Sequence, residues 1–382
     1  MMDQSGRNGV DQSHTPAHTP VDHKGRGASG AGSSDWVRIV VVTVLLLGAV
    51  YVARGVVTPI AFALFLIALV WPLQARLQAH VPRLLALAVS VLVLVVTFVG
   101  FASIIVWGIG RVGRWILANL DRFQLLYDRN TAWLEDHGVA VAGIWAEHFS
   151  VGWMVGVVQT VTGQVNTTLS FWLVVLVYVI LGLLEVDGSA RKIGALPNRN
   201  AARILLAGGA ETAQKFRRYM VVRTLMSLLT GALVWAFAAL FGLPLAREWG
   251  VIAFALNYIP FIGPFIATLF PTLLAMVQYE SWQSVVTIFA GLNAIQFVVG
   301  NYVEPRLSGS ALAMSPSVVL FSIFLWTFLW GLPGTFIGVP IAVAVLTFCA
   351  QADRTRWLAI LLGPPDPPDP LDGPERKGGG RP

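Results

Sequence analysis

Long stretches without a charged residue limit what this chain can fold into. A helix needs about 20 consecutive apolar residues to cross the hydrocarbon core of a bilayer. Of the 382 residues, 56% are hydrophobic and 12% are charged, whereas soluble domains carry about 25% charged residues. The uncharged stretches are Leu84–Gly110, Phe149–Leu184, Thr224–Ala246, Trp249–Tyr279, Ser281–Val303 and Leu307–Ala352. The sequence therefore predicts an all-α polytopic membrane protein.

These stretches, together with the apolar segment 36–73, divide into about eight transmembrane helices. Trp36–Leu73 is nearly twice as long as one span and is interrupted at Arg54-Gly55, so we expect two helices there. Prolines and glycines inside the late stretches predict that some helices are broken. The expected spans are 36–53, 56–73, 84–107, 168–185, 222–241, 250–278, 283–303 and 316–349.

Lysine and arginine predict the orientation. The segment 186–222 is strongly basic, and such segments stay in the cytoplasm. Counting eight spans outward from it then places both termini in the cytoplasm.

The remaining segments divide the chain further. Residues 1–35 are polar and 353–382 are rich in proline and glycine, so both are expected to be disordered tails. Membrane helices 1–3 occupy 36–109, and membrane helices 4–8 occupy 166–352. Between them, 110–165 has mixed charge with apolar residues at helical spacing, which predicts an amphipathic helical insertion on the extracytoplasmic side.

Several classes of function are disfavoured. Cys349 is the only cysteine, and the six histidines do not cluster at ligand spacing, so we expect no metal site. No phosphate-binding glycine loop is present and no nucleophile–base pair lies in the spans, so we expect neither a cofactor nor an enzyme. The net charge of +6 fits the cytoplasmic lysine and arginine of a membrane protein rather than nucleic-acid binding.

Three places combine helix breakers or charges with apolar surroundings. Backbone groups freed at membrane depth must be buried in protein or face a wet cavity, so these places are candidates for a solute pathway. The first place contains Asn257, Pro260, Gly263 and Pro264; the second Asn301, Glu304, Pro305 and Arg306; the third Gly331, Gly334, Gly338 and Pro340.

Each place also has a plainer interpretation. The first is alternatively a kinked packing helix. At the second, Glu304 and Arg306 flank a proline and form a mutual ion pair or pair with other loops; alternatively they belong to a solvated loop. The third divides the span 316–349 into broken helices whose ends bind ions or polar solutes. Alternatively it forms a re-entrant hairpin, or provides small residues for close packing.

At these residues the chain resembles the autoinducer-2 exporter (AI-2E) family of bacterial permease-like proteins. The motifs that carry the resemblance are IPFIGPFIATLFP at 259–271, NYVEPRLSG at 301–309 and SPSVVLFSIFLWTFLWGLPGTFIGVP at 315–340. The resemblance covers roughly residues 40–350. It implies an oligomeric inner-membrane protein that moves small solutes without hydrolysing ATP, some relatives being exporters of the quorum-sensing compound autoinducer-2 and others sodium/proton antiporters.

The leading hypothesis is therefore a secondary transporter that exports a small polar metabolite, possibly autoinducer-2-like. Its other expected partners are membrane lipid and further copies of the chain. A cation/proton antiporter is the alternative, and it needs a membrane-embedded carboxylate, for which Glu304 is the candidate. A non-transporting membrane scaffold is a further alternative.

Overall fold

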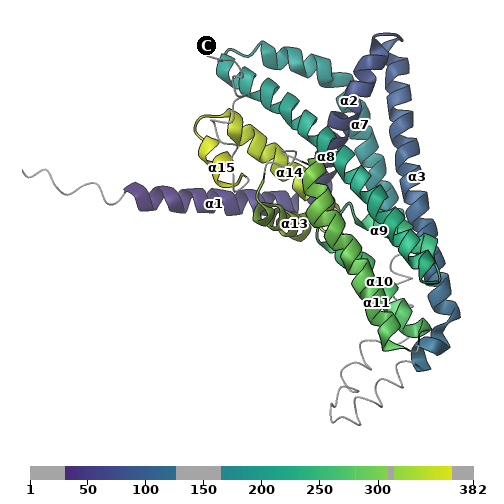
Figure 1. Ribbon diagram of the computed structural model, residues 1–382. Helices are drawn as coiled ribbons and strands as arrows, with labels where there is room; N and C mark the ends of the chain where they lie inside the picture. The colour runs from purple at the N-terminus through teal and green to yellow at the C-terminus, as the bar shows by residue number, and fades with distance from the viewer. Residues whose placement is uncertain (1–30, 126–164, 280, 309–313, 364–382) are drawn as a thin grey trace, which may run out of the picture. The chain divides into compact units, whose positions relative to one another are not determined.

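The computed structural model describes residues 31–125, 165–279, 281–308 and 314–363 (Figure 1). The chain divides into two compact units, Met1–Ala49 and Val50–Pro382. Helix α1 (Ala31–Val52) holds the described residues of the first unit, and the other described helices belong to the second. The described residues contain helices and no strand, which confirms the predicted all-α class.

Six of the described helical stretches are long and apolar enough to cross a membrane, so the chain is a multi-pass membrane protein. Helix α1 ends at Val52 and α2 begins at Arg54, where the sequence predicted a division. The six stretches are α2 (Arg54–Gln78), α3 (Arg83–Ala118), Leu169–Gly194 within α7 (Val165–Gly194), α8 (Arg199–Leu240), Trp282–Leu307 and α14 (Leu332–Gln351).

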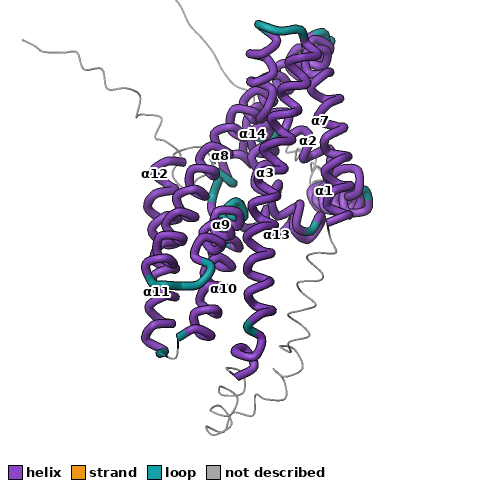
Figure 2. The backbone as a smooth tube through the Cα atoms, turned by 90° about the vertical axis from the view of Figure 1, so that its right-hand side faces the viewer, coloured by secondary structure: helices purple, strands orange, loops and turns teal. Residues whose placement is uncertain are grey.

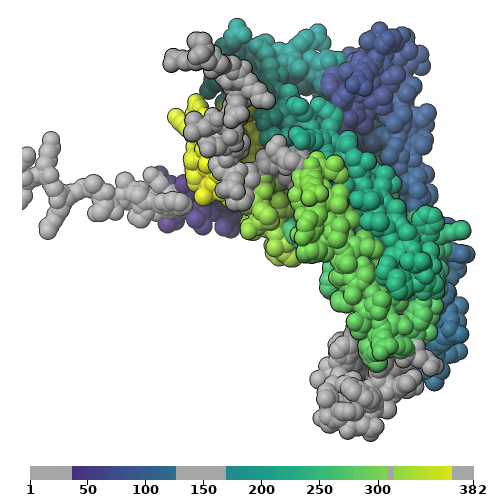
Figure 3. Space-filling model, in the orientation of Figure 1, coloured from purple at the N-terminus to yellow at the C-terminus, as the bar shows by residue number. Residues whose placement is uncertain are grey.

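Helix α8 is the centre of the second unit. It packs against α2, α7 and α14, and also against α9 (Ala246–Leu256) and α11 (Trp282–Val298). In the space-filling view α11 lies against α8, and in the tube view α3 lies beside α9 (Figures 2 and 3). With 42 residues, α8 is about 63 Å long, roughly twice the thickness of the hydrocarbon core.

Two expected spans are broken. The span 250–278 consists of α9 and α10 (Ile262–Gln278), separated by a turn at 257–261, which confirms the predicted interruption at the prolines. The span 316–349 consists of α13 (Pro316–Trp330) and α14, which meet at Gly331 and pack against each other. With 15 residues, α13 is about 22 Å long and too short to cross the core alone. The hairpin interpretation of this segment is the one that the structure supports.

The structure also differs from the sequence-based boundaries. Helix α3 continues to Ala118, into the segment 110–165 that was expected to be a separate insertion, because its apolar face packs on α9. Residues 126–164 of that segment lie outside the described residues. The tail predicted for 353–382 begins with a short helix, α15 (Arg356–Leu361), which is held by a hydrogen bond from the Ser315 N–H to the Leu362 carbonyl (3.2 Å). Residues 1–30 and 364–382 of the two predicted tails are likewise not described.

Candidate functional site

An ion pair joins α8 to the helix that follows α11. The Arg223 guanidinium Nη1 lies 3.0 Å from Glu304 Oε1, and the two side chains are 7% and 26% exposed. The Arg223 Nε is buried without a hydrogen-bond partner, and the guanidinium carbon lies 6.0 Å from the centre of the Tyr219 ring. A buried ion pair is expensive to form and more expensive to leave half-broken. These two groups therefore hold each other in place.

The position of Glu304 depends on a local departure from α-helical geometry. Residues Val299–Val303 form one π-helical turn between α11 and α12 (Glu304–Ser308). A π-turn inserts an extra residue, so every side chain after it moves to a different face of the helix, and such turns are frequent at functional sites. Pro305 follows directly and has no N–H for a regular α-helical bond. The turn thus brings the Glu304 carboxylate to α8.

Two side chains connect the turn between α9 and α10 to the part of α8 that carries Arg223. Asn257 is buried, and its Nδ2 donates to Ser227 Oγ over 3.3 Å. The Tyr258 hydroxyl donates to Thr224 Oγ1 over 3.0 Å. Thr224 and Ser227 lie within about one helical turn of Arg223. The first interrupted segment and the ion pair therefore meet at one level of α8.

Within that turn the backbone is strained. Phe261 has φ 64° and ψ −52°, and the Ile262 N–H donates to the Pro260 carbonyl over 2.7 Å, which closes a γ-turn of the rare positive-φ kind. Gly263 follows where a Cβ atom would lie 1.9 Å from the Leu256 carbonyl oxygen, so only glycine fits. Such strain persists only where the surrounding structure enforces it.

The third interrupted segment is the tip of the α13–α14 hairpin. Gly331 has φ 67° and ψ −145°, a conformation that is essentially restricted to glycine. At Gly334 a Cβ atom would lie 1.8 Å from the Trp326 carbonyl oxygen. Below the tip, the Ser322 hydroxyl donates to the Gly338 carbonyl over 2.7 Å, which ties the two helices together. Helix α14 then carries Pro340 toward α8 and α2.

A cavity of about 130 Å³ lies beside Tyr258 of the α9–α10 turn, Arg223 of α8 and Pro340 of α14. Its walls come from α2, α7, α8, the α9–α10 turn and α14, and they are mostly aromatic, with Arg223 as the charged member. The lining residues are Phe62, Phe65, Leu66, Trp172, Tyr219, Met220, Arg223, Tyr258, Phe336, Ile337 and Pro340. Specific small-molecule sites combine apolar walls with a few fixed polar groups in this way.

A family model of AI-2E family transporters matches residues 40–354 of the chain, which include the α9–α10 turn, Glu304 and the hairpin. The chain belongs to the AI-2E family. The resemblance inferred from the sequence motifs is confirmed, and the protein is a membrane transporter of this family. The chain is similar to the AI-2 transport protein TqsA of Escherichia coli K12. The two are 26% identical over 324 residues, which cover 84% of this chain and 92% of TqsA.

Two further relatives are described as putative transport proteins. The Escherichia coli K12 protein YhhT is 33% identical over 174 residues, which cover 46% of this chain and 50% of YhhT. A Haemophilus influenzae protein is 26% identical over 338 residues, which cover 84% of this chain and 93% of that protein.

The candidate residues of the three interrupted places occupy unequal positions around the cavity. Of the candidates, Pro340 lines it directly, and Glu304 reaches it through Arg223. Asn257, Pro260, Gly263, Gly334 and Gly338 are buried, and Pro264 is half-buried, in the turns and helices that frame it. Asn301, Pro305, Arg306 and Gly331 are exposed.

One expectation about the charges requires correction. Glu304 and Arg306 do not form a mutual pair; Glu304 pairs with Arg223, and Arg306 makes no ion pair among the described residues. They do not share a face, because residues two apart on a helix point about 160° away from each other. Sequence reasoning missed Arg223 because it stands at the edge of an uncharged run, where a basic residue is read as an interfacial anchor. The available signal was that Arg223 is the one charged residue within the expected span 222–241.

Proposed function

We propose that this transporter exports a small polar metabolite, possibly autoinducer-2-like, through the cavity beside the Arg223–Glu304 pair. The observation that carries the proposal is that Tyr258 of the α9–α10 turn, Pro340 of α14 and Arg223, the ion-pair partner of Glu304, all line this one cavity. Its volume of about 130 Å³ is below the 300–1,000 Å³ of drug-sized sites, so it suits a small solute. Aromatic faces would hold the solute's carbon skeleton, and Arg223 would donate to its oxygens.

The wider setting belongs to the same proposal. The protein would lie in the bacterial inner membrane with both termini in the cytoplasm, in contact with membrane lipid, and would assemble as a homo-oligomer. It would have no nucleic-acid partner and no enzymatic activity. The basic character of 186–222 supports the orientation, and the transport names of the relatives support the absence of catalysis.

A cation/proton antiporter is less well supported by the charges. It needs a carboxylate that alternates between a proton and a cation, whereas Glu304 is already paired with Arg223, and Glu248 with Arg111. A fixed guanidinium beside the carboxylate repels an incoming cation. We therefore rank solute export above cation exchange.

The test is flux in proteoliposomes loaded with autoinducer-2, with and without sodium and pH gradients. Glu304→Gln and Arg223→Lys should each lower efflux at least about tenfold, since removing or misplacing either charge raises the barrier by more than about 1.4 kcal/mol. Arg306→Gln is the matched control, because Arg306 is nearby, exposed and outside the pair, and it should stay within about twofold of wild type.

Other outcomes would contradict the proposal. Equal losses in Arg306→Gln and Glu304→Gln would mean that general charge on this surface matters rather than the pair. Sodium-dependent proton movement that Glu304→Gln abolishes, without autoinducer-2 efflux, would favour the antiporter. No flux of either kind from correctly assembled wild-type protein would favour a scaffold.

A further inference from the structure

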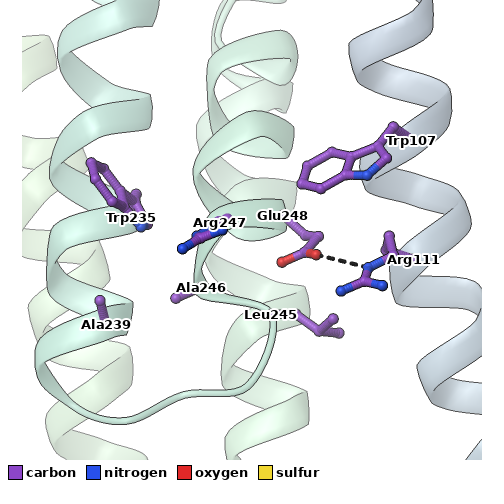
Figure 4. A pocket seen from close by; sticks show the side chains of 8 residues that line it. All are labelled: Trp107, Arg111, Trp235, Ala239, Leu245, Ala246, Arg247 and Glu248. Atoms are coloured by element: carbon purple, nitrogen blue, oxygen red, sulfur yellow. Dashed lines mark hydrogen bonds and ion pairs between the residues drawn. The ribbon is translucent and has the colours of Figure 1, made fainter.

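A second pocket, of about 500 Å³, lies at the opposite end of α8 from the basic segment (Figure 4). Helix α3 contributes one wall, α8 the facing wall, and the start of α9 lies between them (Figure 4). The lining residues are Trp107, Arg111, Trp235, Ala239, Leu245, Ala246, Arg247 and Glu248. None of them lines the cavity described above.

The charges in this pocket leave one positive group uncompensated. Arg111 Nε donates to Glu248 Oε1 over 3.1 Å, and the Glu248 side chain is only 6% exposed, so that carboxylate is already neutralised (Figure 4). Arg247, the neighbour of Glu248 on α9, is exposed and forms no ion pair with any described residue. Arg111 remains 55% exposed after pairing. Arg247 therefore has no acidic partner among the described residues, and Arg111 pairs with Glu248 through its Nε alone, which leaves its terminal N–H groups outside that bond.

The depth of the pocket along α3 matches a membrane interface. Arg111 lies 28 residues after Arg83, the first residue of α3 (111 − 83 = 28), which is about 42 Å along the helix and beyond a core of about 30 Å. Trp107 and Trp235 are 44% and 49% exposed, and half-exposed indoles are typical of the headgroup level. On the core side, α3 continues with the exposed apolar side chains of Ile104 and Val106.

We propose that this pocket binds the phosphate headgroup of an anionic phospholipid, whose acyl chains lie along the exposed apolar face of α3. Guanidinium groups bind phosphate oxygens with two parallel hydrogen bonds, and two are present here with a single carboxylate. The adjoining apolar surface selects a lipid over a soluble phosphate, because only a lipid covers both parts. A zwitterionic lipid brings an ammonium group next to the arginines and binds less well.

Binding is tested with the purified full-length protein in detergent, by native mass spectrometry and by thermal unfolding. The probes are dioleoylphosphatidylglycerol, dioleoylphosphatidylcholine and sn-glycerol-3-phosphate. A ligand that binds only the folded state raises the unfolding temperature with its concentration. Phosphatidylglycerol should give a discrete adduct and raise the unfolding temperature, phosphatidylcholine should do so less, and glycerol phosphate should do neither. An equal effect of glycerol phosphate would overturn the lipid assignment in favour of a soluble anion.

The informative variant is Arg247→Gln, since Arg111→Gln would also leave the buried Glu248 unpaired and endanger folding. Arg247→Gln should weaken phosphatidylglycerol binding about fivefold, the effect of one basic residue near an anionic headgroup. The matched control is Arg218→Gln, an exposed arginine on α8 outside the pocket, which should bind as wild type does. Wild-type affinity in Arg247→Gln, or an equal loss in Arg218→Gln, would overturn the proposal.

Discussion

At the scale of single residues, the Arg223–Glu304 pair allows the effect of a substitution on stability to be measured separately from its effect on transport. Arg223 is 7% exposed and Glu304 is 26% exposed. Breaking a fully buried pair from one side costs about 3–5 kcal/mol, and the partial exposure of Glu304 reduces this to about 1–3 kcal/mol. Replacing both members by apolar side chains of similar size is often nearly neutral.

We therefore expect Glu304→Gln to lower the free energy of unfolding by about 1–3 kcal/mol, and the double variant Arg223→Met, Glu304→Leu to recover most of the loss. Solute flux should stay at least about tenfold below wild type in the double variant, because the polar groups are gone. Unfolding in mixed detergent and proteoliposome flux measure the two quantities. A double variant that loses the sum of the two single losses would show that the residues do not act as a pair.

At the scale of helices, contacts between backbones set which glycines the fold needs. A Cβ atom added at Gly231 of α8 would lie 2.8 Å from the Gly250 carbonyl oxygen and 2.8 Å from Phe254 Cβ. At Gly209, on the same helix, it would have no atom within 4 Å. Small residues allow such close approach of helices in membranes. The packing of α8 against α9 therefore requires glycine at position 231, whereas no helix contact requires glycine at position 209.

Gly231→Ala should therefore lower the free energy of unfolding by about 1–3 kcal/mol through overpacking. Gly209→Ala should leave it unchanged or raise it by up to about 1 kcal/mol, because alanine favours the helix over glycine. Unfolding of the two variants side by side in the same detergent checks this. If both variants were equally stable, α8 and α9 would separate more easily than the distances indicate.

At the scale of the whole molecule, the length of α8 and its charge predict how the chain lies in the membrane. At about 63 Å the helix must project from the core, and its basic residues other than Arg223 lie in the N-terminal half. The positive-inside rule places this half in the cytoplasm. The turn before α8 and the far end of α3 then lie on opposite sides of the membrane.

Cysteine labelling in a Cys349→Ser background measures this arrangement. Ala195, in the turn before α8, and Ala118, the last residue of α3, are both exposed alanines and form a matched pair. Ala195→Cys should react with an impermeant thiol reagent only from the cytoplasm, and Ala118→Cys only from outside. Labelling of both positions from one side would contradict the arrangement.

The sequence by itself determined the class of the protein, its family and the places where its helices break. Uncharged runs, prolines and glycines act locally, through burial and through lost hydrogen bonds, so they can be read without a structure. The break between α9 and α10 was predicted in this way. Only the tertiary structure decided that Glu304 pairs with Arg223 rather than Arg306, and that α13 and α14 form a hairpin. The ion pair and the hairpin both depend on which helix faces pack together. The paired residues are 81 positions apart in the sequence, and their contact requires a π-turn that the local sequence does not predict.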